Sequence, residues 1–160
     1  MVFRSVGITI VFVTHDQEEA LVMSDRIAVF NNGRIVQVAA SSDVYEHPAT
    51  AFVSTFVGTA NVLDGEAAQR VLGRTGMFSL RPEKVLIDRM PDGEHVRSAR
   101  GTVRNVEYLG PLTRFVVDVG GGCHLAVLEQ NDSDKFTDVM ARLGSEVTVA
   151  WHDSAVQAMS

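Results

Sequence analysis

The stretch Ile8–Phe30 reads ITIVFVTHDQEEALVMSDRIAVF and decides how the first part of the chain is expected to fold. Residues 8–13 are nearly continuous apolar and β-branched, which favours a strand buried on both faces, as in a parallel sheet. His15 follows this run after a single residue. In open α/β sheets the groups that contact ligands lie beyond the carboxyl ends of the strands. His15 is therefore the leading candidate site residue.

A short helix is expected directly after His15. Thr14 and Gln17 have the spacing of a capping box, which predicts a helix that ends near Ser24. The first turn of this helix is acidic. Carboxylates at that position compensate the helix dipole, so we expect solvation rather than a metal site there. The acidic residues are Asp16, Glu18 and Glu19.

A hairpin and two further helices complete the first part of the chain. Residues 26–30 and 34–38 are strand-like, and the Asn31-Asn32-Gly33 sequence between them is typical of a hairpin turn. A serine cap predicts a short helix that stops near Pro48. Apolar residues then recur at helical spacing over 49–57, which predicts an amphipathic helix.

The pattern changes after Thr59. Short strand-like runs recur with turn signals between them, and only residues 134–143 look helical. Many short strands with regular turns indicate a small barrel or sandwich. We therefore expect two domains, residues 1–60 and 61–160. The expected strands cover residues 77–80, 84–87, 100–108, 113–119, 124–128 and 146–151.

Composition limits the possible functions. The 160 residues carry a net charge of −6, divided evenly between the two expected domains. Neither part is a basic arm, so nucleic acid and an anionic membrane surface are not expected partners. The single Cys123 excludes an intramolecular disulfide. Residues 8–13 are too short to span a bilayer. A cytoplasmic protein is expected.

Two groups of residues resemble one known family. The segment VTHDQEEAL…SDRIAV…NGRIVQ, within residues 13–37, resembles the switch-histidine region of ATP-binding subunits of ABC importers. FSLRPEKV at residues 78–85, GTV…VEYLGPLT at 101–113 and VTVAW at 147–151 resemble the TOBE domain that follows the ATPase in many of them. The implied fold is α+β: a truncated α/β remnant followed by an OB-like TOBE β-barrel.

The resemblance implies a role for His15 and also a limit on it. In the family this histidine reaches the γ-phosphate of ATP, where a donor stabilises charge on the phosphoryl oxygens. The 160 residues contain no G-x-x-x-x-G-K-[ST] loop, no Leu-Ser-Gly-Gly signature and no apolar strand that ends in Asp-Glu. We therefore expect the chain to be cut inside the catalytic domain. His15 is not expected to act in it, and no enzyme activity, cofactor or metal is expected, although the parent family uses ATP and Mg.

The function implied is that of a non-catalytic regulatory and dimerisation module. The parent protein would drive solute uptake together with membrane permease subunits, at the inner face of the membrane. Residues 58–63 and 106–110 are most similar to polyamine-type importers, for spermidine or putrescine, and importers of sugars, iron and phosphonates share much of this pattern. A homodimer is expected, because a bare apolar strand at residues 8–13 invites pairing.

Two other functions compete with this interpretation. An OB-type nucleic-acid binder would use stacking aromatics in a basic groove. The expected domain of residues 61–160 instead carries a net negative charge. A small-oxyanion sensor is the second alternative, for which Ser98-Ala99-Arg100 is a faint signal. The aromatics available for stacking are Phe78, Tyr108, Phe115 and Trp151.

Several further residues have an ordinary structural interpretation. The remaining histidines are scattered without a partner at ligand spacing, so no zinc site is expected. Cys123 is expected to be a packed core thiol, and Phe52 and Phe56 are expected to be core residues. Arg81 and Glu83 could pair to order the barrel or contact a second regulatory domain. The scattered histidines are His47, His95, His124 and His152.

Overall fold

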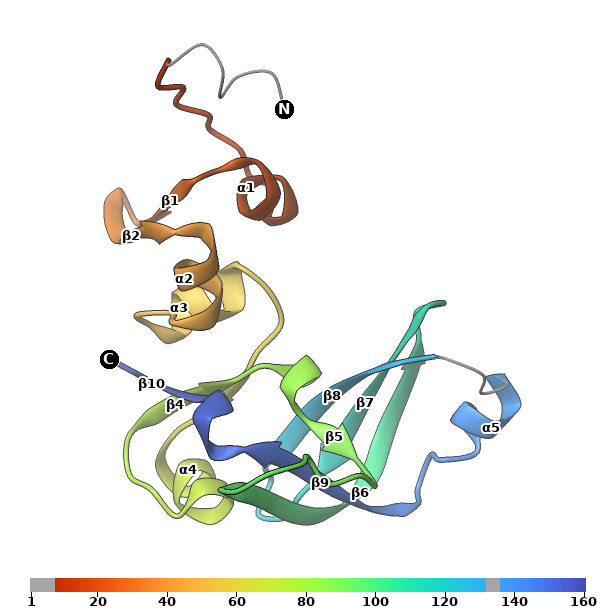
Figure 1. The fold of residues 1–160 in the computed structure, drawn as a ribbon. Helices are drawn as coiled ribbons and strands as arrows, with labels where there is room; N and C mark the ends of the chain where they lie inside the picture. Colours follow the sequence, from red (N-terminus) through yellow and green to blue (C-terminus); the bar gives the residue numbers. More distant parts are fainter. Residues whose placement is uncertain (1–7, 132–135) are drawn as a thin grey trace.

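The computed structural model describes residues 8–131 and 136–160. In Figure 1 a smaller N-terminal part lies above a larger β-rich part. The N-terminal part contains a β-hairpin and three short helices. Its elements are α1 (Gln17–Met23), β1 (Arg26–Asn31), β2 (Arg34–Ala40), α2 (Ser41–Glu46) and α3 (Ala51–Phe56).

The predicted hairpin and the two helices that follow it are confirmed. β1 and β2 pair antiparallel, and Asn32 and Gly33 at the turn have φ of 49° and 74°. Positive φ at both central residues is the geometry that Asn-Gly supplies in a tight hairpin. One face of the hairpin packs on α2 and α3 through a small core. That core consists of Val29, Val44, Val53 and Val57.

The strand predicted over residues 8–13 is wrong. These residues have no regular secondary structure, and Val11 and Val13 are 87% and 90% exposed. A strand needs a neighbour that pairs with its backbone. Within the described residues no other strand runs alongside this segment, and Figure 1 shows it extending away from the hairpin. The apolar pattern alone could not supply the missing neighbour.

The cap of α1 also differs from the prediction. Asp16, not Thr14, is the N-cap residue, and its Oδ1 accepts a hydrogen bond from the backbone N–H of Glu19 at 3.0 Å. The Thr14 hydroxyl accepts from the Asp16 N–H and donates to the Glu19 carboxylate. The helix therefore begins at Gln17, and an aspartate carboxylate takes the capping role that was predicted for the Thr14 hydroxyl.

The β-rich part contains two sheets. A three-stranded sheet has the order β10-β4-β3, and a five-stranded sheet has the order β5-β9-β6-β7-β8. The strands are β3 (Asn61–Leu63), β4 (Met77–Leu80), β5 (Leu86–Ile87), β6 (Val96–Tyr108), β7 (Leu112–Asp118), β8 (His124–Gln130), β9 (Glu146–His152) and β10 (Val156–Met159). The helices are α4 (Gly65–Leu72) and α5 (Phe136–Met140), with 3-10 turns η2 (Pro82–Lys84) and η3 (Asp153–Ala155).

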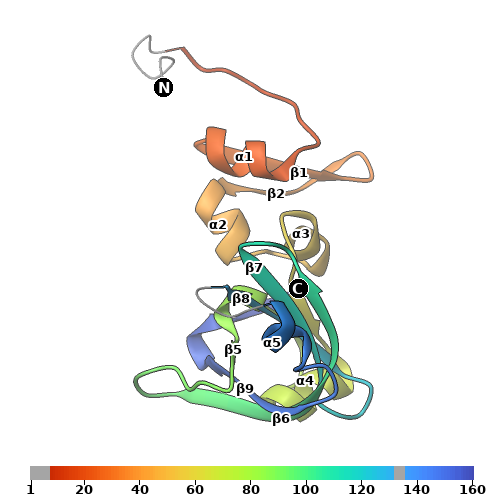
Figure 2. The same ribbon diagram turned by 90° about the vertical axis from the view of Figure 1, so that its right-hand side faces the viewer.

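The five-stranded sheet curls around one core. Figure 2 shows its strands surrounding the interior of the β-rich part. The fully buried side chains include Trp151, Phe115, Leu80 and Leu125. Within the described residues β5 and β8 form no ladder with each other, so the barrel is open along this seam. The α+β, OB-like architecture expected from the sequence is confirmed.

Three elements of this part were not predicted. α4 buries Ala68, Val71 and Leu72, and it ends at Gly73 in the left-handed conformation. The helical spacing and the glycine stop are both visible in the sequence, so α4 could have been found. β3 and β10 are too short to show an alternating pattern. Their pairing with β4 on its two sides defines them.

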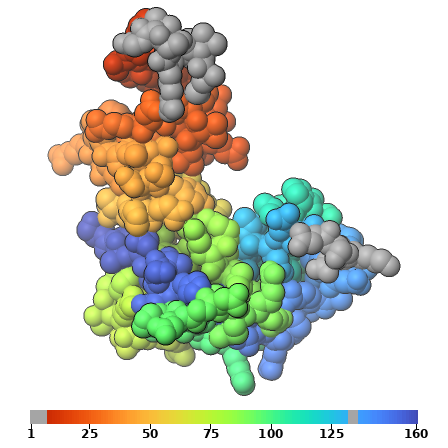
Figure 3. Space-filling model, in the orientation of Figure 1, coloured from red at the N-terminus to blue at the C-terminus, as the bar shows by residue number. Residues whose placement is uncertain are grey.

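The two parts are in direct contact. In Figure 3 the orange and yellow surface of the helices meets the dark-blue C-terminal strand and the light-green segment near residue 80. The contact involves α3 and β4 and includes residues on both sides of the expected boundary near residue 60. None of the helices in the described ranges is long and apolar enough to cross a membrane.

Candidate functional site

His15 lies on the exposed segment that leads into α1. Its side chain forms no hydrogen bond with any other described residue. The residues around it are Thr14 and the acidic first turn of α1, which bond to one another. A γ-phosphate contact would need cationic or backbone donors near the imidazole. Beside His15 the described structure offers the backbone N–H groups of the first turn of α1, of which that of Glu19 is bonded to Asp16.

The most elaborate polar arrangement lies where the two parts meet. We call this arrangement the junction. Its centre is Arg81, which follows β4 directly and is only 4% exposed. The junction consists of Tyr45, Ser54, Thr59, Ser79, Arg81 and Glu83.

The Arg81 guanidinium donates four hydrogen bonds to backbone carbonyls of the N-terminal part and the segment after it. Nη1 donates to the carbonyl oxygens of Ser54 at 2.8 Å and Thr59 at 3.1 Å. Nη2 and Nε donate to the carbonyl oxygen of Tyr45 at 2.8 and 3.3 Å. Burying a charged group is costly unless its donors are satisfied, and here nearly all of them are.

The ring of Tyr45 packs against the flat face of the Arg81 guanidinium. The Arg81 Cζ lies 4.0 Å from the centre of the Tyr45 ring, a cation–π geometry. The phenol of Tyr45 donates to Glu83 Oε1 at 2.8 Å. Burial, followed by the hydrogen bond and the negative charge of Glu83, raises the pKa of Tyr45 to about 12. Burial also lowers the pKa of Arg81.

Arg81 and Glu83 do not form the ion pair considered for them, and the alternative contact with a second regulatory domain stays a prediction. Both side chains bond to Tyr45, on the N-terminal part of the same chain. In the sequence the Arg-Pro-Glu segment gave no indication of these partners. Ser54 and Tyr45 lie 27 and 36 positions from Arg81 along the chain.

Further polar contacts surround the junction. The hydroxyl groups of Ser54 and Ser79 are 2.6 Å apart and buried. The Lys84 Nζ lies 3.5 Å from the Glu46 carboxylate. His47 Nδ1 lies 3.1 Å from Gln157 Oε1 on β10. These contacts place α2 and α3 against β4, η2 and β10.

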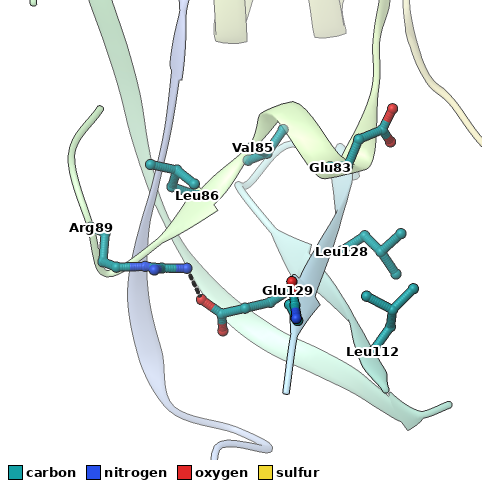
Figure 4. Close-up of a pocket in the computed structure, with 8 residues that line it drawn as sticks. Glu83, Val85, Leu86, Arg89, Leu112, Leu128 and Glu129 are labelled. Carbon is teal, nitrogen blue, oxygen red and sulfur yellow. Dashed lines mark hydrogen bonds and ion pairs between the residues drawn. The ribbon is translucent and has the colours of Figure 1, made fainter. Parts of the chain in front are cut away.

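A second candidate site is the hollow at the open seam of the barrel. It has a volume of about 300 Å³, and Figure 4 shows its lining residues between β5 and β8. Arg89 Nη2 and Glu129 Oε1 are 2.5 Å apart across this seam. Arg142 contacts both Glu129 and Asp88. Because these charges neutralise one another, the network bridges the two strand edges and leaves no free charge aimed at a ligand.

The remaining candidates do not come together. Within the described residues no group of three potential metal ligands is found, and the acidic residues of α1 face solvent. Cys123 is buried, and burial raises the pKa of its thiol. Phe52 and Phe56 stack at 5.4 Å, with Phe52 against the small core. Arg100 is exposed on β6.

The aromatics of the β-rich part are mostly unavailable for stacking. Phe115 and Trp151 are inside the barrel core, and Phe78 is also buried. Of the four candidate aromatics only Tyr108 is exposed, and its ring packs edge-on against the exposed Phe136 at 5.2 Å. A single-strand binding surface needs several exposed rings along a basic groove. The described surface does not offer that arrangement.

Comparison with known proteins assigns the family. Residues 78–159 match the TOBE domain, and the chain belongs to the TOBE domain family. Its curated relatives include the uncharacterized ABC transporter ATP-binding protein YdcT of Escherichia coli K12, 47% identical over 92% of this chain and 43% of the relative. They also include the spermidine/putrescine import ATP-binding protein PotA of Thermobifida fusca, 41% identical over 92% of this chain and 44% of the relative.

Two other comparisons extend this result. The putrescine transport ATP-binding protein PotG of Escherichia coli K12 is 32% identical over 97% of this chain and 48% of the relative. Among solved structures, the cytoplasmic molybdate-binding protein ModG with molybdate bound aligns with a TM-score of 0.42 and 17% identity, over 59% of this chain and 71% of that chain. The chain spans less than half the length of the curated relatives named here. The resemblance to ATP-binding subunits of polyamine-type ABC importers is confirmed.

Proposed function

We propose that this chain supplies the regulatory part of an ABC importer ATP-binding protein. Residues 1–60 would be the end of the nucleotide-binding domain, and residues 61–160 would be the TOBE regulatory domain. The observation that carries the proposal is a matched TOBE domain in a chain of which 92% aligns with a relative named as an import ATP-binding protein. The relatives named for spermidine and putrescine make polyamine uptake the favoured process.

His15 would be the residue that meets the nucleotide. In the proposed complex its imidazole, at the exposed start of α1, would donate to a phosphoryl oxygen as negative charge develops there. Phosphoryl transfer depends on phosphate positioning and on a metal ion, and these 160 residues contain no phosphate loop. We therefore propose that the chain by itself does not hydrolyse ATP and takes no cofactor of its own.

The partners follow from the same proposal. A second copy of the chain and the permease subunits of the importer would be the partners, at the inner face of the membrane. The exposed apolar residues of the N-terminal part support association, because contiguous apolar surface of this kind marks interaction sites. These residues include Ile8, Ile10, Val11, Phe12 and Val13.

A chimera tests the proposed function. The matching region of the putrescine transport ATP-binding protein of E. coli is replaced by this chain, and putrescine uptake is measured in cells that lack the native subunit. We expect uptake to be retained and to be lost on His15→Ala. The matched control is His124→Ala, an exposed histidine on β8. A chimera that accumulates and assembles normally without uptake would contradict the proposal.

The isolated chain gives a second measurement. Purified protein should show no ATP turnover above that of the His15→Ala variant. Nucleotide-dependent turnover that is abolished by His15→Ala would show that the catalytic parts are present after all. Binding of single-stranded nucleic acid or of molybdate would instead favour the alternative functions. The burial of Phe115 and Trp151 weighs against the first of these.

A further inference from the structure

One guanidinium satisfies the ends of two helices. The carbonyl oxygens of the last turn of a helix have no partner inside the helix and carry partial negative charge. Tyr45 lies in the last turn of α2, and Ser54 lies in the last turn of α3. Arg81 donates to the carbonyl oxygens of both. The C-terminal ends of α2 and α3 therefore converge on a single side chain from the β-rich part.

The local geometry requires arginine at this position. The Arg81 guanidinium donates four hydrogen bonds to three carbonyl oxygens, and its flat face lies on the Tyr45 ring. Lysine is a point charge with three donors and no planar fork, so it cannot reproduce this arrangement. Gly58 supplies the space: a Cβ atom there would lie 3.1 Å from Tyr45 Cε2 and 3.5 Å from Arg81 Nη1.

The other links between the two parts are weaker. Exposed contacts, which contribute little to stability, join Lys84 to Glu46, His47 to Gln157, Tyr45 to Glu83 and Ser160 to Ala49. Ser54–Ser79 is buried but is a single neutral hydrogen bond. Each part also has its own apolar core, and Arg81 belongs to neither. Removal of Arg81 therefore affects the contact between the parts before it affects either core.

We propose that Arg81 is a positioning residue that sets the orientation of the β-rich part on α2 and α3. It acts through the two helix ends and the Tyr45 ring. Without it the two parts change their relative orientation while each remains folded. This inference goes beyond the proposed function, because it depends on the contacts of the junction and not on what the parent protein transports.

Spin labels on the two parts test the proposal in the full 160-residue chain. Arg34→Cys at the hairpin turn and Asp92→Cys in the loop before β6 are exposed positions for the labels, in a Cys123→Ser background. The inter-label distance distribution is measured by pulsed electron paramagnetic resonance. We expect one narrow distribution for the parent chain. For both Arg81→Lys and Arg81→Met we expect a shift to a broader one.

Two measurements distinguish a change in the relative orientation of the two parts from unfolding of either part. Trp151 is the only tryptophan and is fully buried, so its emission reports the β-rich part. Amide hydrogen exchange in β1 and β2 reports the N-terminal part. For both Arg81 variants we expect blue-shifted Trp151 emission and retained hairpin protection. Loss of either signal in both variants would overturn the proposal, since Arg81 would then be needed for folding itself.

Matched variants complete the experiment. Arg104→Lys removes a fork that donates two hydrogen bonds to Asp118 within the β-rich part. Ser79→Ala removes the hydroxyl pair at the junction itself. We expect both to keep the narrow distribution. An unchanged distribution in Arg81→Met, or equal broadening in Arg104→Lys, would overturn the proposal.

Discussion

The two parts of the molecule differ in how they bury their apolar residues. The β-rich part encloses a large core that includes Phe115, Leu125 and Trp151. The N-terminal part has a core of four valines, and its hairpin also exposes Phe30 and Ile35 on its outer side. A hairpin with apolar residues on both faces is suited to contact on both. The comparison indicates that the β-rich part is stable alone and that the N-terminal part depends on another surface.

Separation of the two parts gives the largest expected effect. A fragment of residues 61–160 should fold and unfold cooperatively, whereas residues 1–60 should remain largely unfolded. The fragment must begin at Asn61, whose side chain bonds to the backbone of Ala126, and it must retain β10, the neighbour of β4. Far-UV circular dichroism and Trp151 emission during urea unfolding measure the result. A cooperative transition in residues 1–60 would show that the small core suffices.

Self-association is the second test of the comparison. Full exposure of an apolar side chain such as Ile10 or Phe12 forgoes roughly 1.5–3 kcal/mol. We expect light scattering to give twice the chain mass of 17.4 kDa. The double variant Ile10→Asp, Phe12→Asp should shift the mass towards the monomer.

The control for association lies on the β-rich part. Leu109→Asp introduces the same charge at an exposed apolar residue after β6. We expect this variant to keep the mass of the parent chain. A parent chain that stays monomeric at high concentration, or a Leu109→Asp variant that dissociates as readily, would contradict the assignment of the interface to the N-terminal part.

Substitutions of two glycines compare how tightly the barrel and the junction are packed. A Cβ atom at Gly101 would lie 2.5 Å from the carbonyl oxygen of Asp118, so the backbone of β7 must move. Gly101→Ala should lower the free energy of unfolding by about 1–3 kcal/mol, as overpacking does. Gly58→Ala meets the Tyr45 ring at 3.1 Å, and this ring can shift by a few tenths of an ångström. Urea unfolding should rank Gly58→Ala as the milder change, and the reverse order would contradict this account.

Acid should weaken the β-rich part slightly through Asp153. Hydrogen bonds from Arg97 and then Arg74 hold the pKa of Asp153 below its ordinary value of 3.8. A lowered pKa means that the folded state favours the carboxylate. Its contribution is therefore present above pH 3.8 and is lost as the pH falls through the folded pKa.

The size of this acid effect is expected to be less than about 1 kcal/mol, because the pair is partly solvated. Thermal unfolding of the parent chain and of Asp153→Asn between pH 6 and pH 3, roughly the range in which carboxylates titrate, measures it. The stability difference between the two proteins should narrow towards low pH. A difference that is constant over this range would show that Asp153 contributes only through packing.

Much of the fold could be predicted from local sequence. Asn32-Gly33 predicted the hairpin, and the strands expected over 113–119 and 124–128 left a turn between β7 and β8, where Gly120, Gly121 and Gly122 all have positive φ. The strands β6, β7, β8 and β9 overlap the strand-like runs predicted over 100–108, 113–119, 124–128 and 146–151, and β6 begins earlier than predicted, at Val96. The boundary between domains near residue 60 stays a prediction, and so does the role of His15.

By itself, then, the sequence determined the turns, the longer strands and the family. Each of these is recognised from a short stretch of consecutive residues. Tertiary structure decided what depends on residues far away in the chain. β3 and β10 are strands because β4 lies between them, and residues 8–13 are not a strand because no described strand pairs with them. The partners of Arg81 were likewise set by folding, since a buried cation is stabilised by the carbonyl groups that the fold brings around it.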